Sequence, residues 1–221
     1  MSRELINVLM SGAGAPGAAG ILKCLQQDKS VHVICADADS DATGKYLAND
    51  FVSIPAAGNS DFTDTVLSIC RKKNIHVLMP LVTKELIPLS QHIKEFELAG
   101  TKLLVSSTAS LEIANNKSRL YEFLQWRGLK IPNFRVVENV EQFQNAVAEL
   151  GHPSKQVCFK PSVSNGSRGF RIISDQFNEA DILFNQKPNN VFIRLNDVLR
   201  VLSSAPFPEL LVSQYLPGDE F

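Results

Sequence analysis

The feature that most constrains the fold is an alternation, over the first 110 residues, of short apolar runs with segments of helical period. The apolar runs have the length of strands, and they are INVLMSG, VHVICADAD, DFVSIPA, IHVLMP and KLLVSS. The segments between them include the helical patterns GAAGILKCLQQ, DFTDTVLSICRKK and KELIPLSQHIKEFELAG. This alternation is typical of a parallel sheet with helices on both faces. We therefore predict a doubly wound α/β domain at residues 1–110, with ligands beyond the carboxyl ends of its strands.

The pattern changes after Thr108, which places a domain boundary near Ser110. Two consecutive helical patterns, within SLEIANNKSRLYEFLQWRGL, come before the next strand. The strands predicted after them are NFRVV, QVCFKP, FRIIS and ELLVSQYL, with a helix at VEQFQNAVAEL and another at DQFNEADILFNQ. QVCFKP and FRIIS are joined by a short loop and should be antiparallel neighbours. Residues 111–221 are thus predicted to form an α+β domain, in which the segment leading to Pro208 stays ambiguous.

Composition excludes several classes of function. With 22 basic and 23 acidic residues the net charge is −1, so no global basic field favours nucleic acid or an anionic membrane surface. No apolar run approaches the roughly 20 residues of a membrane span, and the chain enters a strand pattern without a signal peptide, so we expect a cytoplasmic protein. The four cysteines and four histidines are scattered, which predicts reduced core thiols and no metal site.

The first of two glycine loops follows the first predicted strand. Gly12, Gly14 and Gly17 fit the pattern G-x-G-x-x-G, and Asp37 ends the second strand about 20 residues later. This combination predicts binding of a dinucleotide such as NAD or FAD. Alternatively, the glycines only make the tight turn from strand to helix that any doubly wound sheet needs.

The second glycine loop, within FKPSVSNGSRGF, lies between two predicted strands and follows a lysine. Such a loop can fold over phosphates, because its glycines offer backbone N–H groups and its serines offer hydroxyls. Lys160 would direct its ammonium at the same anion, and Lys117, at the start of a helix, could reach it from another side. A solvated hairpin with an ordinary surface lysine is the alternative. The residues that this loop would contribute to a phosphate site are Ser162, Ser164, Gly166, Ser167 and Gly169.

Taken in order, these motifs resemble the front part of the ATP-grasp superfamily. The similarity extends over VLMSGAGAPGAAGILKCL, ICADAD, IHVLMPLVTKELIPL, NNKSRLYEFLQWRGLKIP, FKPSVSNGSRGF and LLVSQYLPGDEF. It is greatest for the large subunit of carbamoyl-phosphate synthase and related carboxylate–amine ligases. The resemblance implies that residues 1–110 are a pre-ATP-grasp domain, whose glycine turn usually binds no dinucleotide. It also implies that residues 111–221 are the first part of an ATP-grasp domain, incomplete at its hinge strand.

The resemblance implies roles for single residues. Lys117 and Lys160 would contact the phosphates of ATP, and the second glycine loop would be the phosphate lid. The hinge strand, where main-chain groups pair with adenine, would end in Gln214, Tyr215 and Leu216, although the family commonly has an acidic residue where this chain has Ser213 and Gln214. The remaining candidates are Glu220 for the ribose hydroxyls, Glu85 for either substrate contact or interdomain packing, and Gly14 as a weak substrate contact.

The expected cofactors are ATP and Mg²⁺, with the metal ligands of the complete enzyme outside this chain. The chemistry implied is attack of a substrate carboxylate on the γ-phosphate, giving an acyl phosphate that an amine or another nucleophile displaces. We therefore expect residues 1–221 to be inactive alone. The acid and the amine are not identified, no nucleic-acid or membrane partner is expected, and a homodimer is left open. Two alternatives remain: an NAD-dependent or nucleotide-sugar enzyme that uses Gly12, Gly14 and Gly17, and a non-catalytic nucleotide sensor.

Overall fold

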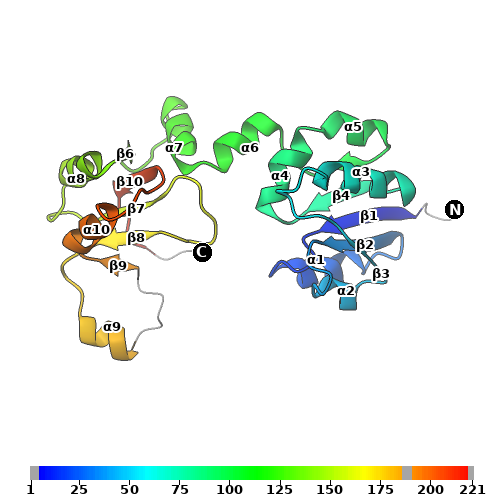
Figure 1. Cartoon of the computed structure of the whole chain (residues 1–221), viewed down its shortest axis with the longest axis horizontal. Helices are drawn as coiled ribbons and strands as arrows, with labels where there is room; N and C mark the ends of the chain where they lie inside the picture. Colours follow the sequence, from blue (N-terminus) through cyan, green and yellow to red (C-terminus); the bar gives the residue numbers. More distant parts are fainter. Residues whose placement is uncertain (1–4, 186–190, 219–221) are drawn as a thin grey trace. The chain divides into compact units, whose positions relative to one another are not determined.

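A computed structural model describes residues 5–185 and 191–218 of the chain (Figure 1). The polypeptide folds as two compact units, residues 1–111 and 112–221. Each unit has its own sheet of five strands among the described residues. We refer to them as unit 1 and unit 2.

Unit 1 alternates strands and helices, as its sequence pattern predicts. Its elements are β1 (Ile6–Ser11), α1 (Ala18–Leu25), β2 (Val31–Asp37), α2 (Gly44–Leu47), β3 (Asp50–Ser53), α3 (Phe62–Lys72), β4 (Val77–Pro80), α4 (Thr83–Ser90), α5 (Ile93–Leu98), β5 (Lys102–Leu103) and α6 (Thr108–Ala114). The strand order is β3-β2-β1-β4-β5, and every described pairing is parallel. The doubly wound α/β fold predicted for this part of the chain is confirmed.

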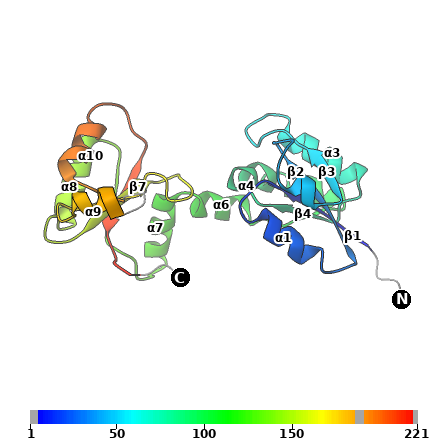
Figure 2. The same cartoon turned by 90° about the horizontal axis from the view of Figure 1, so that it is seen from below.

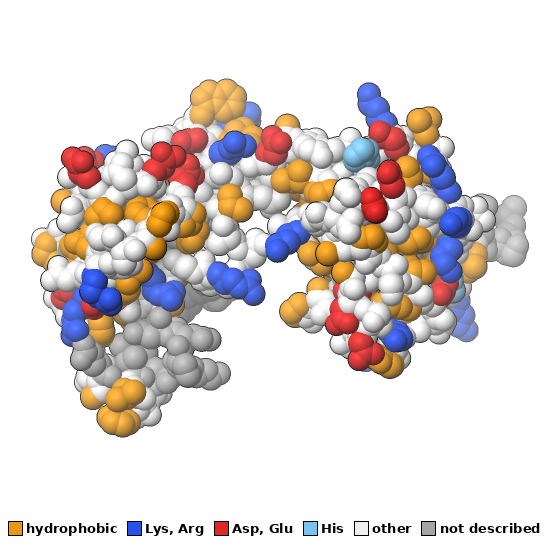
Figure 3. Space-filling view, in the orientation of Figure 1, with side chains coloured by type: hydrophobic (Ala, Val, Ile, Leu, Met, Phe, Trp, Pro, Cys, Tyr) orange, Lys and Arg blue, Asp and Glu red, His pale blue; other side chains and the backbone are white. Residues whose placement is uncertain are grey.

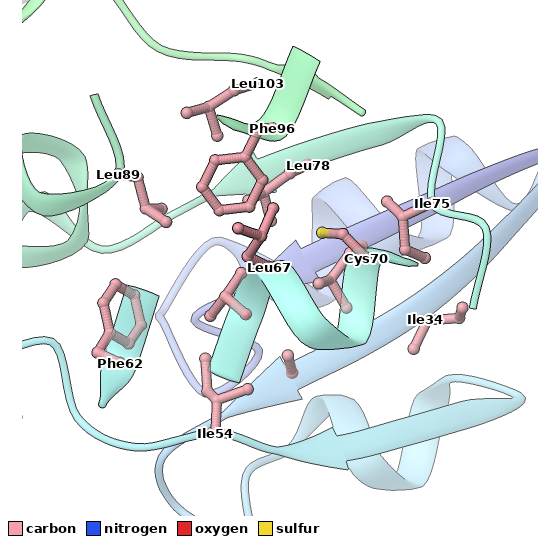
Figure 4. Packing of buried hydrophobic residues seen from close by; sticks show 13 residues of the cluster. Ile34, Ile54, Phe62, Leu67, Cys70, Ile75, Leu78, Leu89, Phe96 and Leu103 are labelled. Atoms are coloured by element: carbon pink, nitrogen blue, oxygen red, sulfur yellow. The ribbon is translucent and has the colours of Figure 1, made fainter. Parts of the chain in front are cut away.

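Helices cover both faces of this sheet (Figures 1 and 2). Leu9 of β1 joins a core cluster with α3, α4 and α5, whereas its neighbour Met10 joins a cluster with α1. Successive strand residues point to opposite faces, so nearly continuous apolar strands bury side chains on both sides. Figure 4 shows the first cluster, in which Phe62 and Phe96 pack around Leu67 and Leu78.

One helix of unit 1 differs from its prediction. The pattern over residues 84–100 predicted a single helix, but the structure has α4 and α5, separated at Gln91 and His92. The hydroxyl of Ser90 donates to the carbonyl oxygen of Ile87 at 2.8 Å and lies 2.9 Å from the hydroxyl of Thr108. Such local bonds from serine compete with the helical pattern. The last strand is also shorter than predicted.

The two predicted consecutive helices are α6, which spans the division between the units at residues 111 and 112, and α7, and unit 2 continues with a mostly antiparallel sheet. Its elements after α6 are α7 (Lys117–Trp126), β6 (Phe134–Val137), α8 (Val140–Glu149), β7 (Val157–Pro161), β8 (Arg171–Ile173), α9 (Glu179–Asn185), β9 (Phe192–Ile193), α10 (Leu195–Leu202) and β10 (Leu210–Gln214). The strand order is β6-β10-β7-β8-β9. The predicted antiparallel pairing of β7 with β8 is confirmed, and the previously ambiguous segment supplies β9 and α10.

The two faces of β7 have different neighbours. Val157 and Phe159 belong to the core cluster that α8 and α10 cover. Cys158 and Lys160 alternate with them and therefore face the other side of the sheet. Lys160 contacts Tyr121 of α7 on that side, so α7 lies over this face. The sheet thus presents Lys160 on the side opposite its main core.

Among the described residues, none of the helices is long and apolar enough to cross a membrane. Basic and acidic side chains both occur on the visible face of each unit (Figure 3). No field of a single sign covers either of these visible faces, in agreement with the net charge of −1.

Candidate functional site

The site is built around the end of β7, where Lys160 stands two residues before the start of the second glycine loop (residues 162–169). Lys160 is paired across the sheet with Leu211 of β10, which fixes its position on the strand. Its ammonium lies 5.3 Å from the ring centroid of Tyr121. Because Lys160 is the penultimate residue of a paired strand, its backbone position is fixed. Only the conformation of its side chain remains to be determined by its neighbours.

Lys117 is the first residue of α7. The side chain of Asn116 caps this helix by accepting from the backbone N–H of Arg119 at 3.1 Å. The backbone N–H of Lys117 donates to the carbonyl oxygen of Ser162 at 2.8 Å, so the start of α7 is bonded to the start of the glycine loop. The Lys117 ammonium donates to the carbonyl oxygen and the hydroxyl of Ser164 at 2.6 and 3.1 Å.

The base of the second glycine loop is fixed by hydrogen bonds. Ser162 is buried, its hydroxyl bonds to the hydroxyl of Ser118, and its backbone N–H donates to the carbonyl oxygen of Glu209 at 3.0 Å. The sequence predicted a hydroxyl for phosphate here. The structure uses Ser162 to join the loop to α7 and to the strand that leads into β10.

The tip of the loop has left-handed backbone. Gly166, Ser167 and Gly169 have φ of 59°, 57° and 78°. These angles make a tight turn rich in left-handed backbone, and successive N–H groups of such turns can form anion-binding concavities. At Gly169 a Cβ atom would lie 2.6 Å from the Pro161 ring, so this position also requires glycine for space.

These elements enclose a pocket of about 240 Å³, which we call the cationic pocket. Three cationic side chains, two from the scaffold and one from the loop, lie around it. The lining residues are Lys117, Lys160, Ser164, Gly166, Ser167, Arg168 and Phe170. None of these described lining residues is acidic, so the pocket concentrates positive charge in a protein whose net charge is −1.

The two lysines affect each other electrostatically. Partial burial and, secondly, the nearby charge of Lys160 hold the pKa of Lys117 below its usual range. Within the described part of the chain, no carboxylate lies within 4.0 Å of either ammonium. A fold that brings two ammonium groups together without an acid is at an electrostatic disadvantage, which a bound anion would offset.

The structure brings together some of the predicted site residues and separates others. Lys117, Lys160, Gly166 and Ser167 line the cationic pocket, whereas Ser162 and Gly169 lie beside it and shape the loop. Arg168 and Phe170 line the pocket but were not among the predicted contacts. The signal for Arg168 was present, because it is the only cation within the loop sequence.

The predicted hinge residues are at the end of β10 and just after it. The N–H groups of Gln214 and Tyr215 donate to the carbonyl oxygens of Asn133 and Gln156, both at 3.0 Å. These two donors are therefore used by the fold, and a base edge would have to use the carbonyl groups or the backbone of Leu216. The side chain of Leu216 is exposed. Glu220 lies outside the described residues.

Glu85 and Gly14 lie in unit 1, at the carboxyl edge of its sheet. Glu85 is in the first turn of α4, is 6% exposed, and accepts a hydrogen bond from the hydroxyl of Ser11 at 2.6 Å. Burial raises the pKa of Glu85, the Ser11 bond opposes that change, and the charge of Asp37 adds to it. The backbone N–H of Gly14 donates to the carboxylate of Asp37 at 2.8 Å. The carboxylate therefore occupies a donor that a dinucleotide phosphate would use.

The chain is similar to several known proteins. Residues 8–104 match the family model described as PylC-like, N-terminal domain. The chain is 27% identical over 175 residues to a formate-dependent phosphoribosylglycinamide formyltransferase of Mannheimia haemolytica, covering 79% of this chain and 41% of that protein. It is 27% identical over 124 residues to the arginine-specific large chain of carbamoyl phosphate synthase of Bacillus subtilis, covering 56% of this chain and 10% of that protein.

Among solved structures, an ADP complex of N5-carboxyaminoimidazole ribonucleotide synthetase matches 98% of this chain and 49% of its own, with a TM-score of 0.65 and 14% identity. The resemblance to ATP-grasp enzymes is confirmed. At this identity the solved structure shows the fold alone. The chain spans less than half the length of these relatives.

Residues 5–185 and 191–218 contain no group of three or more His, Cys, Asp or Glu side chains that could hold a metal ion. The donor set around the cationic pocket is made of ammonium, guanidinium, hydroxyl and backbone groups, which do not fit Mg²⁺. We therefore assign no step to magnesium in this chain.

Proposed function

We propose that unit 2 binds the phosphates of ATP, and that the whole protein is an ATP-dependent carboxylate–amine ligase. The observation that carries the proposal is the cationic pocket, which is lined by Lys117, Lys160 and Arg168 and by left-handed residues of the glycine loop, with no acidic residue among the lining residues. Polyphosphate is the ligand that such a set of donors recognises best.

Each group has a role in this proposal. Lys160 and Lys117 bond to phosphate oxygens from the sheet and from the start of α7. The N–H groups of Gly166 and Ser167 cover the same oxygens from the loop, and Arg168 adds a charge from the loop itself. By spreading the negative charge of the phosphates over fixed donors, the pocket would favour attack of a substrate carboxylate on the γ-phosphorus with ADP as the leaving group. An amine would then attack the carbonyl carbon of the acyl phosphate, forming the C–N bond and releasing inorganic phosphate.

The test is a titration of residues 1–221 with ATP, followed by the chemical shifts of the backbone amides. We expect shifts at residues 162–170, and weaker binding of AMP because it lacks the β- and γ-phosphates. Lys160→Met and Lys117→Met should each weaken ATP binding by about 10- to 100-fold, since each removes a charge-assisted bond of roughly 1.5–3 kcal/mol. Lys130→Met is the matched control, because Lys130 is exposed and does not line the pocket.

Unchanged ATP affinity in a folded Lys160→Met variant would contradict the proposal, and so would shifts confined to other parts of the chain. Catalysis is tested separately. We propose that residues 1–221 bind ATP without hydrolysing it, and magnesium-dependent ADP release by the purified chain measures this. Release that Lys160→Met abolishes would show that this length of chain is already catalytic.

A further inference from the structure

The cation of Lys160 is placed by an aromatic ring. Its ammonium lies 5.3 Å from the centroid of Tyr121, which is within the distance at which a cation is attracted to the face of a ring. Tyr121 is four residues after Lys117 in α7, so both side chains project from the same side of that helix. The helix that begins at one lysine of the cationic pocket thus carries the ring that contacts the other.

The ring itself is held by a second aromatic side chain. Tyr121 and Phe134 of β6 make an edge-to-face contact, with centroids 5.3 Å apart and planes at 79°. Tyr121, Phe134 and Lys160 are all partly buried. The ring therefore packs against a residue of the sheet on one side.

A ring suits this position better than a carboxylate would. A lysine side chain is flexible and loses conformational freedom when it is fixed. A carboxylate could hold the ammonium, but it would also neutralise the charge that a phosphate needs. The quadrupole of an aromatic ring attracts the cation and leaves its charge in place. Within the described residues, Lys160 accordingly has an aromatic partner and no carboxylate within 4.0 Å.

We propose that Tyr121 is a positioning residue that holds the Lys160 ammonium for a phosphate in the cationic pocket. The proposal rests on the proposed function, because it assigns the phosphate as the ligand of Lys160. It predicts that the ring matters and that the phenol hydroxyl does not. It also predicts that Tyr121 acts on binding only through Lys160.

The experiment compares Tyr121→Phe with Tyr121→Leu by titration with ATP. Tyr121→Phe keeps the ring and should bind ATP within about twofold of the original chain, whereas Tyr121→Leu should bind about 3- to 10-fold more weakly. In a Lys160→Met background Tyr121→Leu should have no further effect, but in a Lys117→Met background its effect should persist. An equal loss in both backgrounds would show a merely structural role and overturn the proposal, as would unchanged binding by Tyr121→Leu.

A second measurement needs no ligand. NMR relaxation of the Lys160 Cε methylene reports how well the side chain is ordered. Tyr121→Leu should lower this order and Tyr121→Phe should not. If the original chain fails to bind ATP, the proposed function fails, and the relaxation result still decides whether Tyr121 holds Lys160. Equal order in all three chains would overturn the positioning role, whatever the outcome of the ATP titration.

Discussion

The two glycine loops of this chain differ in what lies against their glycines. In the first, at residues 12–17, a Cβ on Gly12 would lie 2.6 Å from the side chain of Val82, and the N–H of Gly14 is taken by Asp37. In the second, at residues 162–169, a Cβ on Gly166 would meet only the guanidinium of Arg168, at 3.5 Å. Gly12 and Gly14 of the first loop are packed by their own unit, whereas in the second loop Gly166 lines the cationic pocket and Gly169 packs against Pro161.

The charges beside the two loops differ as well. Asp37 and Glu85 lie at the first loop, whereas Lys117, Lys160 and Arg168 lie at the second. Glycine in a loop after a strand therefore has two physical uses, the close packing of backbone and the presentation of N–H groups. The neighbours of the glycines, rather than their spacing, distinguish these uses.

The largest effect that separates the loops is expected from Gly12→Ala. Alanine would have to adopt φ of 73° and would press on Val82, so we expect a loss of about 2–4 kcal/mol in the free energy of unfolding. Amide exchange in β1 and β2 measures the change in unit 1. ATP binding by the folded fraction should be unchanged, because the first loop is assigned to packing.

Gly20→Ala is the matched control for this substitution. Gly20 lies within α1, and a Cβ there would meet nothing within 4 Å. Alanine should therefore stabilise unit 1 by about 0.5–1 kcal/mol through helix propensity. A Gly12→Ala chain as stable as the original would show that the first loop is not closely packed, and a Gly12→Ala chain that loses ATP binding while folded would give that loop a ligand.

The second loop is tested by Gly169→Ala. Alanine would need φ of 78° and would lie 2.6 Å from the Pro161 ring, which has little freedom to move. We expect a loss of about 2 kcal/mol in stability and about tenfold weaker ATP binding, because the loop would leave its left-handed shape. Trp126 is the only tryptophan and lies in unit 2, so its fluorescence reports the unfolding of this unit.

Gly166→Ala provides the comparison within the same loop. It has a similar backbone requirement, with φ of 59°, but the added methyl group would make only an ordinary van der Waals contact with the Arg168 guanidinium at 3.5 Å. The stability loss should be about 1 kcal/mol, from backbone strain alone. Equal losses for the two variants would mean that contact with Pro161 does not shape the loop.

The fold was predictable where burial leaves a periodic pattern in the sequence. The strands of unit 1 are buried on both faces, so a nearly continuous apolar run such as Val31–Asp37 could be recognised as a strand from the local sequence alone. The pairing of β7 with β8 followed from the short loop between them. The division of the helix at Gln91 was not predictable, because it depends on a hydroxyl of Ser90 that bonds outside its own helix.

The candidate site was predictable for residues whose chemistry is visible in the chain. Lys117 and Lys160 carry the charge that a phosphate needs, and both line the pocket. Ser162 was assigned to the ligand, but its hydroxyl bonds to Ser118, which lies 44 residues earlier. Tyr121 could not be assigned for the same reason. Which polar or aromatic groups meet depends on how α7 lies over the sheet, and a local pattern does not contain this information.

The smallest expected effect concerns Glu85, one of the two acidic residues beside the first glycine loop. Glu85 has a pKa raised above the ordinary value of 4.5, chiefly because it is buried. The folded chain therefore holds this proton more tightly than the unfolded chain does. At pH values between 4.5 and the pKa of Glu85 in the folded state, the folded chain binds more protons than the unfolded chain. The free energy of unfolding therefore falls as the pH rises through this range. The contribution of Glu85 is fully present below pH 4.5 and is lost as the pH rises through the folded pKa.

Glu85→Gln should remove this dependence, because the amide can still accept the hydrogen bond from Ser11 and does not ionise. The measurement is the free energy of unfolding in urea from pH 4.5 to about pH 8. Asp37→Asn should reduce the slope without abolishing it, since the charge of Asp37 is a smaller cause of the raised pKa than burial. If the free energies of unfolding of Glu85→Gln and of the original chain changed with pH in parallel, Glu85 would not have a raised pKa in the folded state. A fully ionised Glu85 would have to be paired with a cation or be accessible to water. The contrast in charge between the first glycine loop and the cationic pocket would then be smaller than the carboxyl groups of Asp37 and Glu85 indicate.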